Sequence, residues 1–179
     1  HYWQNFRGFW PPEGVVKTVF SESALRANDA FGKHQFTGRN FQIIGFFDPA
    51  FGGGDRAALR FAKIGEIVGG NWGIEAMPAI IVPISAISKN PVHFQLAEQV
   101  KLRAARIMVG GIEEHCPPEN FGLDATGEGG GLADILQRTW SYRIIRVEFG
   151  GKASEDSCNL EDNRPAFEVY DNKSVEMWF

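Results

Sequence analysis

Residues 41–55 read FQIIGFFDPAFGGGD, an apolar run that ends abruptly in an acid, a proline and three glycines. The run is almost unbroken from Phe41 to Phe47, which predicts a central strand covered on both faces. Asp48 follows, and the next residue ends the strand because proline has no N–H to give to a ladder. The glycines then allow a sharp turn before a second acid, Asp55.

Asp48 is therefore predicted to lie at the mouth of a buried strand. A carboxylate in that position is costly to desolvate unless a cation lies beside it. A divalent metal ion is a frequent partner in sites lined by carboxylates. The same spacing also fits an aspartate that merely caps a turn. Taken alone, this stretch leaves both interpretations open.

The length and composition are those of one folded domain rather than of a disordered chain. The sequence has 179 residues, of which 44% are hydrophobic and 22% charged, enough for one domain with its own core. The formal net charge is −4, so any contact with nucleic acid needs a local basic surface. Cys116 and Cys158 form no paired motif, which predicts neither a disulfide framework nor a zinc site and favours a reducing compartment. No apolar run is long enough to span a membrane.

The elements after the first strand follow from hydrophobic spacing. A second strand is predicted over residues 56–68, a turn at 69–71 and a third strand within 76–87, which together make an antiparallel meander. Apolar residues at helical spacing predict a helix over residues 92–109, preceded by a proline and ended by two glycines. A short strand that ends in Asp124 comes next.

A glycine-rich loop follows Asp124, and then a helix at 132–138, a strand at 142–149 and a last helix that begins at Asn172. The predicted fold is thus α/β, with a mixed sheet in which a three-strand meander precedes helix, strand, helix, strand and helix. If the strands that end in Asp48 and Asp124 are neighbours, the two carboxylates approach each other. One pKa then rises unless a cation lies between them. This is the arrangement of a two-metal phosphodiesterase site.

The second acidic stretch also has a competing interpretation. Strand, glycine-rich loop and helix describe a dinucleotide-binding fingerprint, and Gly127, Gly129 and Glu148 supply part of it. Against this, Leu132 stands where a third glycine or an alanine is required. Asp124 would repel a pyrophosphate, and an antiparallel meander does not suit a doubly wound sheet.

Five short stretches of the sequence follow one another in an order that is typical of a known family. They are RGFWPPEG at 7–14, FDPA at 47–50 with GGDR at 53–56, GLDATG at 122–127 with GGG at 129–131, FGGKAS at 149–154 and NKSVEMW at 172–178. In this order they resemble the C-terminal nuclease domain of the large terminase subunit of tailed bacteriophages, the DNA-packaging motor. The resemblance implies an RNase H-like fold for residues 41–179, and it makes residues 1–40 an arm or linker from an ATPase domain.

The resemblance also implies a function. It makes the chain a metal-dependent endonuclease that cuts concatemeric viral DNA with Mg²⁺ or Mn²⁺ in a two-metal site. Asp48 and Asp124 match the first two metal-binding, catalytic acids, and Asp55 matches a nearby acid that assists a metal. Arg56 and Lys152 are the candidate cations for contact with DNA phosphates, and a solvated surface role fits each of them equally well. The implied partners are double-stranded DNA and, in the full protein, an ATPase domain, the portal and the small terminase subunit. The implied location is the procapsid in the host cytoplasm, away from membranes.

One departure from the family pattern concerns the third metal-binding acid. In the family this acid follows the Asn-x-x-x-Glu-Met helix, in a segment that would come after Phe179, and Glu176 on the helix is not expected to replace it. His1 and Phe179 both look like cuts within a longer polypeptide, so the C-terminal part of the domain is expected to be missing. The alternative function is therefore a catalytically silent module that docks on DNA or on the portal.

Overall fold

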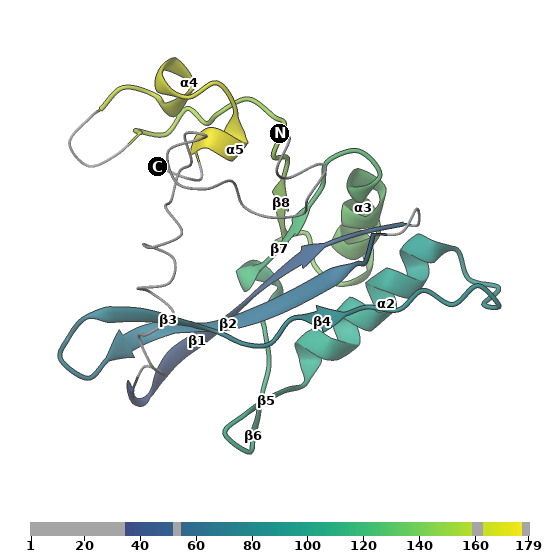
Figure 1. Cartoon of the computed structure of the whole chain (residues 1–179), viewed down its shortest axis with the longest axis horizontal. Coiled ribbons are helices and arrows are strands. Elements are labelled where there is room, and N and C mark those ends of the chain that lie inside the picture. Colours follow the sequence, from purple (N-terminus) through teal and green to yellow (C-terminus); the bar gives the residue numbers. More distant parts are fainter. Residues whose placement is uncertain (1–34, 52–54, 159–162, 177–179) are drawn as a thin grey trace, which may run out of the picture. The chain divides into compact units, whose positions relative to one another are not determined.

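The structure is a computed structural model that describes residues 35–51, 55–158 and 163–176 (Figure 1). The aromatic segment 7–14 of the predicted N-terminal arm lies outside these residues, as do Gly53 and Gly54 of the first acidic motif. The last residues of the predicted arm already belong to a strand, because the first strand begins at Phe36 rather than Phe41. Its register is irregular between these two residues, and Gly38 has a positive φ of 61°.

The described residues form a mixed sheet in the order β3-β2-β1-β7-β8, with β4 paired to β2. β1, β2 and β3 are antiparallel to one another, whereas β7 and β8 run parallel to β1. The strands are β1 (Phe36–Asp48), β2 (Ala58–Ile67), β3 (Trp72–Ala76), β4 (Ile80–Ile81), β7 (Phe121–Asp124) and β8 (Ile145–Val147). The predicted α/β class, with a meander that precedes helix, strand, helix and strand, is confirmed.

Helices α2 (Val92–Ala105) and α3 (Gly129–Thr139) pack against each other and against one face of this sheet (Figure 1). Side chains alternate between the two faces of a strand, and along β1 the positions that alternate with Asp48 are buried. One hydrophobic cluster joins strands and helices, and its fully buried members include Phe47, Leu59, Leu96, Val100, Phe121, Leu123, Leu132 and Leu136. The face of β1 that bears Asp48 is therefore the face turned away from this core.

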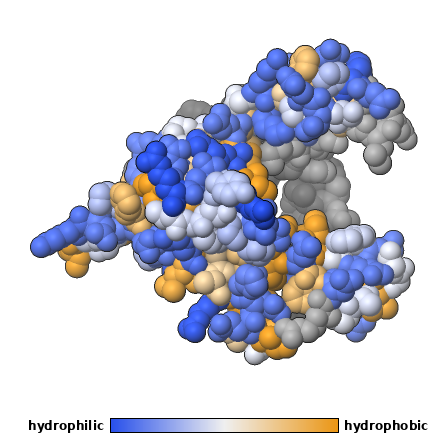
Figure 2. Space-filling model, turned by 180° about the vertical axis from the view of Figure 1, so that it is seen from behind, coloured by the Kyte–Doolittle hydropathy of each residue, from blue (hydrophilic) through white to orange (hydrophobic). Residues whose placement is uncertain are grey.

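That second face of the sheet carries exposed apolar side chains. By strand register, Trp72 and Ile74 of β3, Ile81 of β4 and Ile145 of β8 lie on the same face as Asp48. All four are exposed, between 48% and 75%. Figure 2, which views the molecule from behind, shows apolar patches of this kind among a mainly hydrophilic surface. The face of the sheet that bears Asp48 therefore also carries exposed apolar side chains.

The third strand of the meander differs from its prediction. It spans Trp72–Ala76, so that only its last residue falls within the predicted range 76–87, where Ile80–Ile81 forms a separate short strand. The reason is the tightness of the preceding turn, in which Gly69 and Gly70 have positive φ and the Ile67 N–H donates to the Asn71 carbonyl at 2.8 Å. Pairing with β2 resumes at once after such a turn, so that Trp72 already lies opposite Glu66.

The end of the long helix also differs from its prediction. α2 ends at Ala105, and Ile107–Val109 forms β5, which pairs with β6 (Ile112–Glu114). Gly110 and Gly111 have φ of 57° and 83°, so they make the turn of this hairpin rather than a helix cap. Two consecutive glycines with positive φ suit a two-residue hairpin turn.

The C-terminal part is less regular than predicted. β8 covers only Ile145–Val147 of the predicted strand 142–149, because its neighbour β7 is itself four residues long. Two short helices follow, α4 (Ala166–Val169) and α5 (Lys173–Glu176), and a 3-10 turn, η2 (Pro118–Asn120), precedes β7. Among the residues that the structure describes, no helix is both long enough and apolar enough to cross a membrane.

Candidate functional site

Asp48 and Asp124 end two neighbouring strands that run in the same direction. β1 and β7 pair in parallel, with Phe46 opposite Gly122 and Phe47 opposite Leu123. The next position on each strand is an aspartate, so the two acids are register neighbours and share a face of the sheet. Adjacent strands lie about 4.8 Å apart. The structure therefore places the two predicted acids side by side at one edge of the sheet.

A cavity of about 620 Å³ opens beside these strand ends. Residues from the exit of β1, from the segment before β2 and from the β7–α3 turn line it. They are Asp48, Pro49, Ala50, Phe51, Asp55, Arg56, Thr126 and Glu128. The walls thus carry more carboxylates than basic groups, and Asp124 lies next to this lining rather than within it.

The surroundings of Asp48 raise the pKa of its carboxyl group. Partial burial of the carboxylate raises its pKa, and the negative charges of Asp124 and then Asp55 raise it further. Because Asp48 is still solvent-exposed, it remains accessible to an ion in the cavity. A carboxylate that is crowded by two others is a group whose charge a cation would stabilise.

The β7–α3 turn is held by Asp124 and by glycine. The Thr126 N–H donates to Asp124 Oδ1 at 2.8 Å, which fixes the carboxylate over the turn, and Gly127 has a φ of 58°. A Cβ on Gly129 would lie 2.2 Å from the Asp124 carbonyl oxygen. These two glycines are therefore required by the backbone itself.

The same turn disfavours the dinucleotide interpretation. The N–H groups of Gly129, Gly130 and Gly131 donate to the carbonyls of the third residue before each, at 3.1–3.2 Å. N–H groups that are used within the turn are not directed at a pyrophosphate, and the Asp124 carboxylate lies next to them. A phosphate-binding loop instead presents such groups to its ligand.

No protein-family model, curated protein or solved structure matches this chain. The interpretation of the site therefore depends on its geometry and on the chemistry of its side chains.

Carboxylate oxygens are ligands that Mg²⁺ and Mn²⁺ prefer. Within the described residues no three His, Cys, Asp or Glu side chains are close enough together to hold a metal ion, so Asp55, although it lines the cavity, does not complete a set of three with Asp48 and Asp124. A hard divalent cation at this place would therefore have the two adjacent aspartates as protein ligands and water for the rest.

The two predicted phosphate-binding cations lie in different places. Arg56 lines the acidic cavity. Lys152 is exposed, and its Nζ lies 4.3 Å from the centre of the Phe167 ring, in a cation–π contact. Lys152 is not among the residues that line the cavity, so only Arg56 is placed beside the aspartates.

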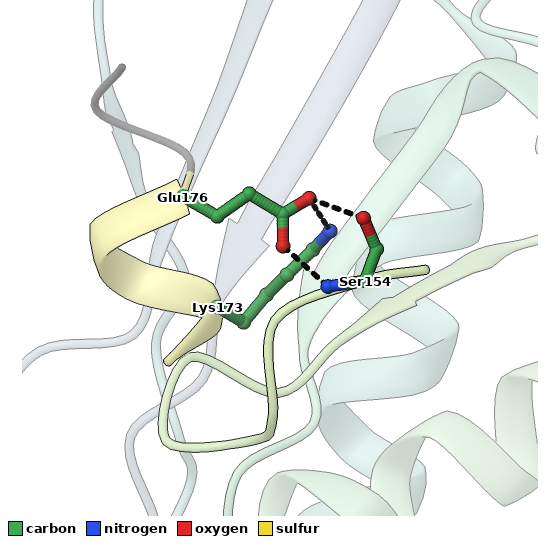
Figure 3. A network of polar contacts seen from close by, with 3 residues as sticks. All are labelled: Ser154, Lys173 and Glu176. Carbon is green, nitrogen blue, oxygen red and sulfur yellow. Dashed lines mark hydrogen bonds and ion pairs between the residues drawn. The ribbon is translucent and has the colours of Figure 1, made fainter. Parts of the chain in front are cut away.

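Glu176 of α5 is engaged in a different network (Figure 3). Its carboxylate accepts hydrogen bonds from the Ser154 N–H and the Ser154 hydroxyl, both at 2.7 Å, and forms an ion pair with Lys173 at 2.5 Å. The hydrogen bond from Lys173 is the main cause that lowers the pKa of Glu176, and the bonds from Ser154 add to it. The two bonds from Ser154, together with the Lys173 N–H bond to the Gly151 carbonyl at 2.8 Å, fasten α5 to residues 151–154. This is the role of a structural residue rather than of a third metal ligand.

We expect Glu176→Gln to lower the free energy of unfolding at about pH 7 by about 1 kcal/mol, because it removes charge-assisted hydrogen bonds. A lowered folded-state pKa gives stability that is present above the unfolded pKa and is lost as pH falls through the folded value. The difference between parent and variant should therefore shrink on acidification. Denaturant titrations at neutral and acidic pH measure it, with the exposed Glu168→Gln as control. An equal loss for both variants at neutral pH would contradict this account.

Sequence reasoning missed two residues of this region, Phe51 and His93. Phe51 lies in the cavity wall, and His93, in the first turn of α2, stacks on it with ring centroids 4.4 Å apart. No local pattern connects a histidine on a helix with an aromatic residue after a distant strand. Thr126 and Glu128 of the wall were not predicted either, but they lie two and four residues after Asp124, so the acidic motif could have drawn attention to them.

Proposed function

We propose that this chain is an RNase H-like nuclease domain of a bacteriophage large terminase subunit, a metal-dependent endonuclease that hydrolyses phosphodiester bonds of concatemeric DNA. The observation that carries the proposal is the adjacency of Asp48 and Asp124. They end the parallel strands β1 and β7 at one register position, beside an acidic cavity. Carboxylates in such a pair are suitable ligands for a divalent cation that would assist phosphoryl chemistry.

The topology supports the RNase H-like part of the proposal. The meander β1–β2–β3 precedes α2, and β7, α3 and β8 then extend the sheet on the other side of β1. This arrangement puts β1 in the middle of the sheet, where its C-terminal end has a parallel neighbour. An acid at the end of β1 therefore meets an acid at the end of β7 directly.

In the proposed site, a cation and Arg56 would together allow DNA to bind beside the carboxylates. DNA is a polyanion, and a cavity with several carboxylates repels it unless a cation is present. Asp48 and Asp124 would hold Mg²⁺ or Mn²⁺, and the Thr126 N–H fixes the direction of the Asp124 carboxylate. The ion would supply charge neutralisation at the scissile phosphate and a lower pKa for the attacking water. Arg56 would contact a backbone phosphate and so position the strand without reading its sequence.

The direct test is cleavage of supercoiled plasmid by this chain in Mn²⁺ or Mg²⁺, with EDTA and Asp124→Asn as controls. We expect nicking and linearisation that require both the cation and Asp124. Binding of Mn²⁺ to the parent and to Asp124→Asn is measured in parallel by electron paramagnetic resonance. Cleavage that persists in EDTA or in Asp124→Asn would overturn the proposed active site.

A second candidate is a catalytically silent module that docks on DNA or on the portal. The observation in its favour is that the described residues contain no group of three metal-binding side chains. It predicts that the parent does not cleave, and that Asp48→Asn/Asp124→Asn binds DNA or portal as well as the parent does. Cleavage by the parent that the double variant lacks would exclude it.

Arg56→Ala is expected to weaken DNA binding by about three- to tenfold and to reduce the salt dependence of binding by about one phosphate contact. The physical reason is that Arg56 is the basic side chain among the described residues that line the cavity. Fluorescence anisotropy at several salt concentrations measures both effects. Lys152→Ala removes a similar charge away from the cavity and is the matched control. A larger effect from Lys152→Ala would contradict the assignment of this contact to Arg56.

A further inference from the structure

His93 contacts both segments that carry the acidic site. Its ring stacks on Phe51 with a centroid distance of 4.4 Å and an interplanar angle of 25°. Its Nε2 lies 3.3 Å from the Glu128 carbonyl oxygen. Phe51 belongs to the exit of β1, three residues after Asp48, and Glu128 belongs to the turn that follows Asp124. One side chain of α2 therefore joins two walls of the cavity that come from different strands.

The contact to Glu128 is part of the hydrogen bonding of the turn. The Glu128 carbonyl also accepts the Gly131 N–H at 3.2 Å, and a carbonyl oxygen has two lone pairs for two such donors. Because the acceptor is a carbonyl, Nε2 must carry the proton. The neutral Nε2–H tautomer and the imidazolium both satisfy this requirement, so the contact does not depend on the charge of His93.

The contact to Phe51 anchors the other wall. Phe51 is half-buried and packs against the hydrophobic core, and the nearly parallel His93 ring covers it. Asp48 lies on the segment that leads to Phe51 and Asp124 on the segment that leads to Glu128, and the negative charge of Asp124 acts on Asp48. Repulsion between these two carboxylates tends to separate the segments that carry them. A side chain that holds both segments opposes this separation.

We propose that His93 is a positioning residue of the candidate nuclease site, a clasp that holds the β1 exit against the β7–α3 turn and so maintains the spacing of Asp48 and Asp124. It contacts neither the cation nor DNA. The proposal rests on the proposed nuclease function as far as its effect on cleavage is concerned. The clasp itself can be tested without metal or substrate.

Three substitutions separate the two halves of the clasp. His93→Phe keeps a ring on Phe51 but loses the donor to Glu128. His93→Gln keeps a donor but loses the stacked ring, and His93→Ala loses both. Phe94→Gln is the matched control, because Phe94 is an exposed ring in the same helical turn and is not part of the cavity wall.

Two metal-free measurements report on the clasp. Amide hydrogen exchange of Gly129–Gly131 reports on the β7–α3 turn, and the NMR shifts of the Phe51 ring protons report on the stack. We expect His93→Phe to accelerate exchange in the turn about tenfold, because opening of the turn becomes easier, with Phe51 little changed. His93→Gln should shift the Phe51 resonances and keep slow exchange, and His93→Ala should show both effects. Phe94→Gln should show neither.

Two functional measurements then test positioning. His93→Ala is expected to weaken Mn²⁺ binding and lower kcat by about tenfold each, as residues that orient ligands do, with the KM for plasmid unchanged. Unchanged exchange and unchanged Phe51 shifts in His93→Ala would overturn the clasp. Altered exchange with parental Mn²⁺ affinity and kcat would overturn its positioning role. If the parent itself neither binds Mn²⁺ nor cleaves, the proposed function fails, and the metal-free measurements still decide whether the clasp exists.

Discussion

If the chain is the proposed nuclease, Asp48→Asn is expected to lower its Mg²⁺- or Mn²⁺-dependent cleavage by at least about 100-fold, because it removes a carboxylate from the proposed cation site. The same substitution should leave the metal-free protein at least as stable as the parent. Asn has nearly the same shape as Asp and lacks the charge that Asp124 and Asp55 repel. A loss of activity without a loss of stability is the pattern of a functional residue that is held under electrostatic strain.

The pH dependence of this stability effect has a definite sign. The pKa of Asp48 is raised in the folded state, by burial and by neighbouring negative charge, so the folded protein binds this proton more tightly than the unfolded chain. The resulting destabilisation is absent below the unfolded pKa, grows as pH rises through the folded value, and is complete above it. The advantage of Asp48→Asn in EDTA should therefore be seen at neutral pH and vanish at low pH.

Thermal unfolding with and without Mn²⁺ gives the readout. A cation that binds only the folded state raises the midpoint of the parent and should leave that of Asp48→Asn unchanged. Asp171→Asn, at an exposed aspartate after α4, controls for the loss of a charge. Parental cleavage by Asp48→Asn, or equal stabilisation of both proteins by Mn²⁺, would be incompatible with the proposed role of Asp48.

The parts of the site that sequence could predict are those with strong local signals. An apolar run that stops at an acid marks the end of a buried strand, and this signal occurs at Asp48 and at Asp124. The sequence left open whether these two strands are neighbours, and the parallel pairing of β1 with β7 supplies that condition. Once they are neighbours, their C-terminal ends lie at the same edge of the sheet and the two acids are adjacent.

The remaining features depend on interactions that a local pattern does not contain. Gly110 and Gly111 fit a helix end and a hairpin turn equally well, and the pairing of Ile107–Val109 with β6 decides between them. Likewise, apolar residues in 79–84 look like a strand, but the tight turn before Trp72 lets an earlier segment take that place in the sheet. The contacts of His93 were the hardest to predict, because its two partners, Phe51 and Glu128, follow different strands and lie far from it in the sequence.

Gly129→Ala is expected to destabilise the protein by about 1–3 kcal/mol and to impair the site more than its stability loss explains. A Cβ at Gly129 would lie 2.2 Å from the Asp124 carbonyl oxygen and 3.5 Å from Pro49 Cγ. The first contact is with backbone, so the start of α3 must move away from the end of β7. That movement displaces Asp124 and the Thr126 N–H that orients it.

Gly130→Ala is the matched control in the same helical turn. Its Cβ would come no closer than 3.5 Å to the Ala125 carbonyl oxygen, an ordinary contact, and Ala favours a helix over Gly by about 0.5–1 kcal/mol. We expect this variant to be as stable as the parent or slightly more stable, with parental cleavage. Denaturant titrations and cleavage assays below both unfolding transitions compare the two variants. Equal effects would show that the glycines are not there for packing against Asp124, whereas the expected contrast would assign Gly129 to the contact that holds the second acid in place.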